Sequence, residues 1–257
     1  MFRGSVQPSI ISLFSSTNSN PLNLFSTQVD GGLPSDSFIH FLDDSTSLPT
    51  PASPATLISA PTLSDDANEL KVGHTLLQSV LHIQSPTLRT TFIRCPPSSS
   101  SSDLGLKHKW LHLQIRNLGR EWSFEVGLVD QAGRCGTVRC STFQKEPRLI
   151  FTPSSPPILH LPLAFPLPST RPLTAWSTIT LNLASLIPHF SSHALTVSSE
   201  DDIEDQVPSA SNLKAPSGQY SHVSYVKVYA TCRLRRIWFS DSGPGQRVPW
   251  EFELYGD

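Results

Sequence analysis

The clearest pattern of apolar and polar positions lies in residues 225–241. From Tyr225 to Leu234, apolar or small residues alternate with residues that are polar or aromatic, which is typical of a β-strand. Val226 and Val228 begin one face, and Lys227 belongs to the other. The alternation therefore predicts a strand with one face in the core.

The alternation breaks where Arg235 and Arg236 are adjacent, because strict alternation would bury one guanidinium without a partner. A β-bulge near Arg235 would return Ile237 and Phe239 to the core and turn both arginines outward. We therefore expect one long central strand with a kink that presents Arg233, Arg235 and Arg236. A solvated cluster of charges that only keeps the strand soluble is the alternative interpretation.

Short strand-like segments separated by turn residues recur through the rest of the chain. Residues 88–95 follow 79–83 after a short turn, and residues 122–128 follow 109–117 after another, so both pairs are expected to form hairpins. Further strands are expected at 21–29, 137–143, 176–183 and 249–255, and a short helix is expected to begin at Ala184.

Three segments lack sustained periodicity and are rich in Ser, Pro or acidic residues. They are interpreted as insertions that are mostly loop or disordered, at 33–70, 144–172 and 189–221. With about eight to ten short strands and almost no helical periodicity, the pattern predicts an all-β fold. We expect a single domain over residues 1–257, an antiparallel β-sandwich or jelly roll with long disordered loop insertions.

The net charge of −2 conceals an uneven distribution of acids. Residues 32–70 hold six acids and no Lys or Arg, and residues 188–221 hold five acids and Lys214. The remainder keeps 10 of the 21 acids and 18 of the 19 bases, a net charge of +8. A basic body of this kind suits an acidic partner surface, whether protein or nucleic acid.

The sequence contains no nucleophile elbow, no phosphate loop and no dinucleotide fingerprint, which are motifs of known catalytic classes. His108 and His112 are spaced for a metal site on a helix but lie on a predicted strand, about 13 Å apart. The four cysteines form no C-x-x-C pair. We therefore expect no enzyme activity, no metal and no cofactor.

The five tryptophans raise the alternative of a carbohydrate-binding platform, although most are expected in the core. No apolar run approaches the ~18 residues of a membrane-spanning helix, so no membrane partner is expected. The first 14 residues are too short in apolar character for a good signal peptide, and there is no N-x-[ST] sequon. These features lead us to expect an intracellular protein.

Several stretches resemble the cilia- and flagella-associated protein 20 family. The resemblance is densest in the Ala-Thr-Cys-Arg-Leu-Arg-Arg-Ile-Trp-Phe-Ser-Asp run at 230–241. It extends to Thr-Thr-Phe-Ile-Arg-Cys-Pro at 90–96, Ile-Arg-Asn-Leu at 115–118 and Glu-Phe-Glu-Leu-Tyr at 251–255. It covers about 60% of the chain and leaves out the three insertions.

The resemblance implies a non-enzymatic β-sandwich protein of the ciliary or flagellar axoneme. Such proteins sit at the inner junction of doublet microtubules, where tubulin and neighbouring axonemal proteins are the partners, and some are found at basal bodies or in nuclei. The candidate partner-binding residues are Arg233, Arg235, Arg236, Lys227 and Trp238, with Trp238 expected to point outward. A nuclear or RNA-associated adaptor using the same basic surface is the alternative, and internal pairing of the arginines with Glu251 and Glu253 also stays open.

Overall fold

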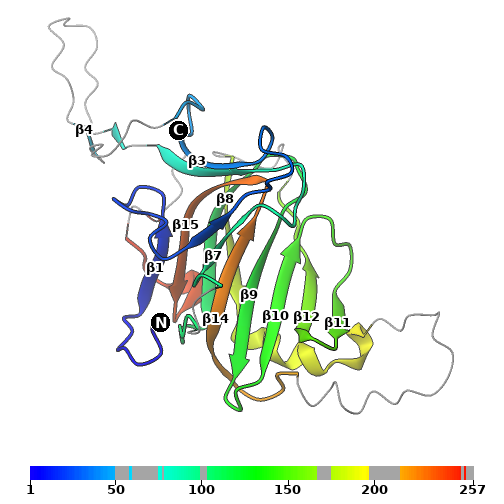
Figure 1. Ribbon diagram of the computed structural model, residues 1–257. Helices are drawn as coiled ribbons and strands as arrows, with labels where there is room; N and C mark the ends of the chain where they lie inside the picture. Colours follow the sequence, from blue (N-terminus) through cyan, green and yellow to red (C-terminus); the bar gives the residue numbers. More distant parts are fainter. Residues whose placement is uncertain are drawn as a thin grey trace, which may run out of the picture.

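A computed structural model describes residues 1–49, 58–59, 75–76, 78–98, 103–166, 175–196, 215–249 and 252. Its strands form two large sheets packed face to face (Figure 1), and one cluster of buried apolar residues takes side chains from both. All but one of the strand pairings in these sheets are antiparallel. The expected all-β sandwich is therefore confirmed.

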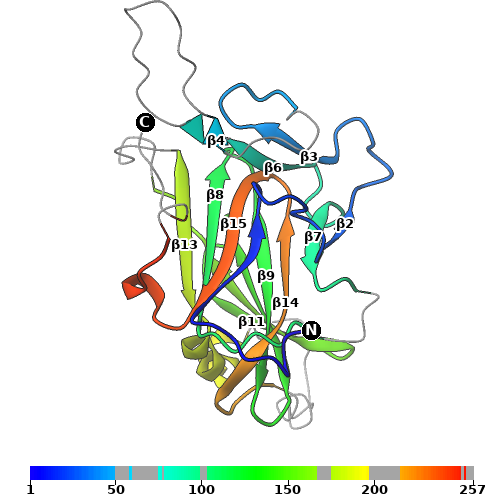
Figure 2. The same ribbon diagram turned by 90° about the vertical axis from the view of Figure 1, so that its left-hand side faces the viewer.

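The six-stranded sheet has the order β13-β8-β15-β6-β3, and β1 also pairs with β15. Figure 2 shows this sheet with β15 near its centre. Its strands are β1 (Ile10–Ser15), β3 (Phe38–Asp43), β6 (Ser79–Gln84), β8 (Trp110–Asn117), β13 (Trp176–Asn182) and β15 (Cys232–Ser240).

The seven-stranded sheet has the order β11-β12-β10-β9-β14-β7-β2, in which β10 and β12 are parallel. Its strands are β2 (Ser26–Gln28), β7 (Phe92–Cys95), β9 (Ser123–Asp130), β10 (Cys135–Ser141), β11 (Arg148–Thr152), β12 (Ser155–Pro162) and β14 (Tyr220–Tyr229).

The remaining described elements are short. They are a two-stranded ribbon of β4 (Ile58–Ser59) and β5 (Thr75–Leu76), and the 3-10 helices η2 (Ala184–Ser191), η3 (His193–Leu195) and η5 (Gly243–Gly245). η2 begins at Ala184 as expected, and it buries Ile187 and Phe190. No helix in the described ranges is long and apolar enough to cross a membrane.

The chain crosses from one sheet to the other at three places where the sequence predicted that it would stay in one sheet, as two hairpins and one long strand. β6 and β7 lie in different sheets, and so do β8 and β9, so both predicted hairpins are wrong. The predicted long strand at 225–241 is likewise divided into β14 and β15, one in each sheet. The turn residues mark where the chain reverses, but a reversal serves a hairpin and a sheet-to-sheet crossing equally well.

Two of the predicted insertions contain complete strands, and the third includes the first two residues of β14. Residues 33–70 include β3, which pairs with β6 along its whole length. Residues 144–172 include β11 and β12, so their interpretation as mostly loop is wrong for these strands. Pro153 lies in the turn between β11 and β12, and Pro156, Pro157 and Pro162 lie toward the ends of β12, where strands tolerate proline best.

Other predictions fall largely or wholly outside the described residues. These are the acidic part of 189–221, the closing strand at 249–255 apart from Pro249 and Phe252, and the pairing of the arginines with Glu251 and Glu253.

Candidate functional site

The arginine-rich strand has the predicted kink but not the predicted exposure. The pairing of β15 with β8 shifts register between Leu234 and Arg236, which confirms the bulge. Ile237 is fully buried, as expected. The arginines, however, are only 6–8% exposed, so the prediction that they face solvent is wrong.

Arg233 is held by an internal ion pair. Its Nη1 donates to the Asp44 carboxylate at 2.7 Å and to the Asp44 backbone carbonyl at 3.0 Å. The same carboxylate accepts from Arg116 at 3.0 Å and from the Trp176 indole N–H at 2.9 Å. Asp44 was counted among the acids of an insertion, yet it fixes the segment after β3 to the centre of the six-stranded sheet.

Trp238 also lies inside rather than outside. It is 3% exposed and stacks on His112, with ring centroids 4.8 Å apart. Phe252 packs over the same face of β15. Its ring meets the Trp238 ring edge-on with centroids 5.3 Å apart, and the Arg236 guanidinium lies 4.7 Å from the centroid of the Phe252 ring. Four of the five sequence-predicted binding residues are therefore buried, because residues distant in the chain pack over β15.

Lys227 alone of the five lies half-buried on an outward face. Its ammonium is 3.6 Å from the centroid of the Phe92 ring and 4.5 Å from that of Tyr229. Partial burial lowers the pKa of Lys227 from its ordinary value. The amine is thus placed between two aromatic rings on the outer face of the seven-stranded sheet.

The neighbours of Lys227 form a straight row of ionisable side chains across this sheet. Direct strand pairing places the members side by side on β7, β14, β9, β10, β12 and β11. We call them the basic row: Arg94, Lys227, Glu125, Arg139, His160 and Arg148. Six adjacent strands at about 4.8 Å spacing give the row a length of roughly 24 Å.

Glu125 is the single carboxylate of the basic row and is 5% exposed. It pairs with Arg139 and accepts the hydroxyls of Tyr229 at 2.9 Å and Tyr225 at 3.2 Å. Burial, together with the Glu125 charge, raises the pKa of Tyr229 well above its ordinary value. Because Arg139 already neutralises Glu125, the charges of the other cations in the row are not balanced by a carboxylate within it.

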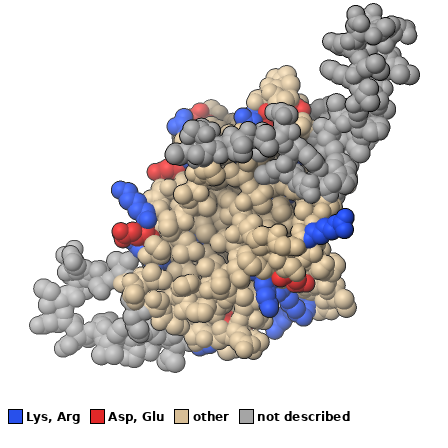
Figure 3. Space-filling model, turned by 180° about the vertical axis from the view of Figure 1, so that it is seen from behind, with Lys and Arg blue, Asp and Glu red and all other residues tan. Residues whose placement is uncertain are grey.

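The cations beyond Glu125 remain accessible in part. Arg94 lies 4.2 Å from the centroid of the Tyr225 ring and is half-buried, and Arg148 at the edge strand is exposed. Burial lowers the pKa of His160, as does the nearby Arg139, so its imidazole favours the neutral form. By contrast, the side shown in Figure 3 carries few charged side chains across its centre.

Sequence reasoning named Lys227 but missed its companions in the basic row. Arg94 and Arg139 are visible as polar positions within strand patterns, but their alignment depends on which strands are neighbours. The rule that residues paired across strands share a face would have found the row once the sheet order was known.

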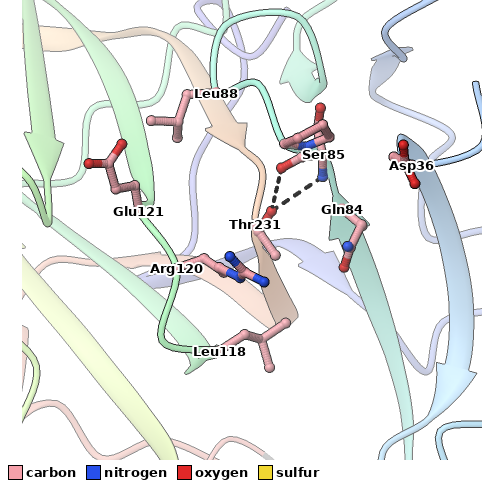
Figure 4. A pocket seen from close by; sticks show the side chains of 9 residues that line it. Asp36, Gln84, Ser85, Leu88, Leu118, Arg120, Glu121 and Thr231 are labelled. Carbon is pink, nitrogen blue, oxygen red and sulfur yellow. Dashed lines mark hydrogen bonds between the residues drawn. The ribbon is translucent and has the colours of Figure 1, made fainter. Parts of the chain in front are cut away.

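A cleft of about 590 Å³ lies where the three sheet-to-sheet crossings meet (Figure 4). Thr231 from the β14–β15 crossing donates its hydroxyl to the Ser85 carbonyl at 2.9 Å and accepts the Ser85 N–H at 3.2 Å. Arg120, Glu121 and Asp36 are exposed on its rim. The Thr231 hydroxyl is thus engaged in joining two crossings, and the cleft offers charged groups for recognition.

Within the described ranges, no three His, Cys, Asp or Glu side chains gather in a way that would hold a metal ion. His108 Nε2 bonds the Pro8 carbonyl at 2.6 Å, while the two ring nitrogens of His112 bond the hydroxyls of Thr180 and Ser240. Each imidazole therefore has its own local partners. Trp122 and Trp176 are also buried, at 1% and 9% exposure, which argues against a sugar-stacking platform built from them.

Comparison with known proteins identifies a domain and several relatives. Residues 70–197 match the CFA20 domain. Cilia- and flagella-associated protein 20 of Chlamydomonas reinhardtii is 29% identical over 178 residues, covering 69% of this chain and 74% of that protein. The protein of the same name from Caenorhabditis elegans is 22% identical over 257 residues, covering 99% and 91%. That from Paramecium tetraurelia is 26% identical over 195 residues, covering 73% and 82%.

Proposed function

The chain belongs to the CFA20-domain family, and from this premise we propose that it is a non-enzymatic, cilium- and flagellum-associated protein that binds microtubules. The relatives described above are named as cilia- and flagella-associated proteins. Tubulin is the proposed partner, and neighbouring axonemal proteins complete the proposed setting at the axoneme or basal body.

The observation that carries the proposal is the basic row. It places Arg94, Lys227 and Arg148 on one sheet face in addition to the neutralised pair of Glu125 and Arg139. A line of partly exposed cations favours contact with an acidic protein surface and raises the rate of encounter. Contacts with Tyr225 and Phe92 hold the Arg94 and Lys227 side chains against the sheet in the free chain.

The same geometry weighs against the alternative of an RNA-associated adaptor. Single-stranded nucleic acid stacks its bases on open aromatic rings. Here the Arg94 guanidinium lies against the Tyr225 ring, and the Lys227 amine lies against the rings of Phe92 and Tyr229. The rings therefore already have cationic partners, and we favour a protein partner.

Co-sedimentation of the full chain with taxol-stabilised microtubules at physiological salt tests the proposal. The full chain is required, because deleting residues 33–70 would remove β3 and Asp44. We expect pelleting that weakens as salt is raised. Absence of pelleting, or binding to RNA in a gel-shift assay with none to microtubules, would contradict the proposal.

A further inference from the structure

A second face of the molecule holds an aromatic–cationic slot. The slot is formed on the outer face of the six-stranded sheet by Gln114 of β8 and by Arg236 and Trp238 of β15. Gln114 is fully buried and Trp238 is 3% exposed. Gln114 lies directly opposite Arg236 in the strand register, so the three side chains form one continuous patch.

The described residues directly after β15 fold back against the six-stranded sheet. After Ser240 the chain forms η5, which lies beside β13 in Figure 2. Gly243 has a φ of +61°, and a Cβ there would come within 2.4 Å of the Trp110 ring. The turn is therefore fitted closely against the sheet.

Phe252 occupies the slot with one ring and one carbonyl. Its ring contacts Trp238 and Arg236, and its backbone carbonyl accepts a hydrogen bond from the Gln114 amide. An aromatic ring between an indole edge and a guanidinium is a favourable arrangement that also serves between separate proteins.

The fit of Phe252 to the slot is incomplete. Gln114 Oε1 and Trp238 Nε1 are buried, and neither has a hydrogen-bond partner among the described residues. A buried donor and a buried acceptor left without partners carry a desolvation penalty. An extended peptide whose backbone offers an N–H to Gln114 and a carbonyl to Trp238 would remove that penalty while keeping the aromatic contacts.

We propose that this slot is a binding site for an aromatic side chain on an extended segment of a partner protein, and that Phe252 is the intramolecular ligand that such a segment displaces. The site is separate from the basic row, which lies on the other sheet, and it does not depend on the proposed binding of microtubules. The chemistry of the ligand follows from the occupant seen: an aromatic ring next to a backbone carbonyl that accepts a hydrogen bond from Gln114.

The test measures fluorescence anisotropy of a labelled peptide with the sequence of residues 249–255. It is titrated with the full chain and with the Phe252→Ala variant. Because the internal ligand competes in the wild-type chain, we expect the variant to bind the peptide at least tenfold more tightly. The same peptide carrying Phe252→Ala should bind the variant at least tenfold more weakly than the unaltered peptide.

A second substitution assigns the binding to the slot. In the Phe252→Ala chain, adding Trp238→Phe keeps an aromatic ring but removes the indole N–H donor. We expect the peptide to bind this double variant at least threefold more weakly than it binds the Phe252→Ala chain. Adding Lys109→Gln, an exposed residue outside the slot, should leave affinity unchanged. Thermal unfolding of each variant establishes that it is folded.

Absence of peptide binding by a folded Phe252→Ala chain would overturn the proposal. Light scattering gives a second criterion. A wild-type chain that is dimeric at micromolar concentration, and monomeric after Phe252→Ala, would show that the slot serves a second copy of the chain, which also overturns it.

Discussion

Replacing Asp44 is expected to reveal how much the ion pair on the outer face of the six-stranded sheet contributes to stability. Asp44→Ala removes the carboxylate that pairs with Arg233 and Arg116 and accepts the Trp176 indole N–H. Arg233 is 8% exposed and cannot recover its hydration without local opening. Removing one partner of a buried ion pair costs about 3–5 kcal/mol.

The lower end of that range is expected for Asp44→Ala. The Arg233 guanidinium keeps a hydrogen bond to the backbone carbonyl of residue 44 and another, of 2.7 Å, to the Ser47 hydroxyl. We therefore expect the free energy of unfolding to fall by about 3 kcal/mol. For an m-value near 3 kcal/mol per molar urea, the midpoint of unfolding falls by about 1 M.

Equilibrium unfolding in urea, followed by tryptophan fluorescence and circular dichroism, measures the effect. Asp36→Ala is the matched control, because Asp36 belongs to the same segment but is exposed, and its effect should stay within about 0.5 kcal/mol. The double change of Asp44→Ala with Arg233→Met should be less destabilising than the sum of the two single changes, since it removes both charges. Equal midpoints for Asp44→Ala and Asp36→Ala, or strict additivity of the two changes, would refute the reasoning.

Three further changes test other parts of the fold. Glu125→Ala removes a buried acceptor for Arg139 and Tyr229, so urea unfolding should show a loss of about 2–4 kcal/mol. Gly127→Ala places a Cβ about 2.4 Å from the Tyr225 ring, so its melting temperature should fall by several degrees. Burial lowers the pKa of His112 from 6.5 to about 4, so protonation at acid pH favours the unfolded chain. The stability that the neutral imidazole contributes is complete above pH 6.5 and is lost as pH falls toward 4. The free energy of unfolding should therefore fall by about 2 kcal/mol between pH 7 and pH 5, and by less in His112→Asn.

Local sequence patterns were sufficient for the class of fold and for the bulge. Alternation along 225–234 and the adjacency of Arg235 and Arg236 involve neighbouring residues only, and both features are present in β14 and β15. The proline-rich segment misled the prediction, because the prolines within β12 lie toward its two ends and leave its central residues, Ile158 to Leu161, to pair with neighbouring strands.

The burial of the arginines could not be read from the sequence. The partner of Arg233 lies 189 positions away, in a segment that looked like an acidic insertion. The basic row depends in the same way on strand order, since its members come from six strands dispersed over more than 130 residues. Long-range pairing decides which polar face is covered, and alternation alone does not specify it.

The central claim, that the basic row binds the partner, is tested most directly by comparing two variants of equal charge in microtubule co-sedimentation. The first variant neutralises the basic row with Arg94→Gln, Lys227→Gln and Arg148→Gln. The second neutralises three exposed cations outside the row, with Lys107→Gln, Lys109→Gln and Arg247→Gln.

Both variants lose three positive charges, so they differ in where the charge is lost. We predict that the first variant loses at least tenfold in affinity for microtubules, and that the second stays within threefold of the unaltered chain. Equal losses in the two variants, with both folded by thermal unfolding, would contradict the claim.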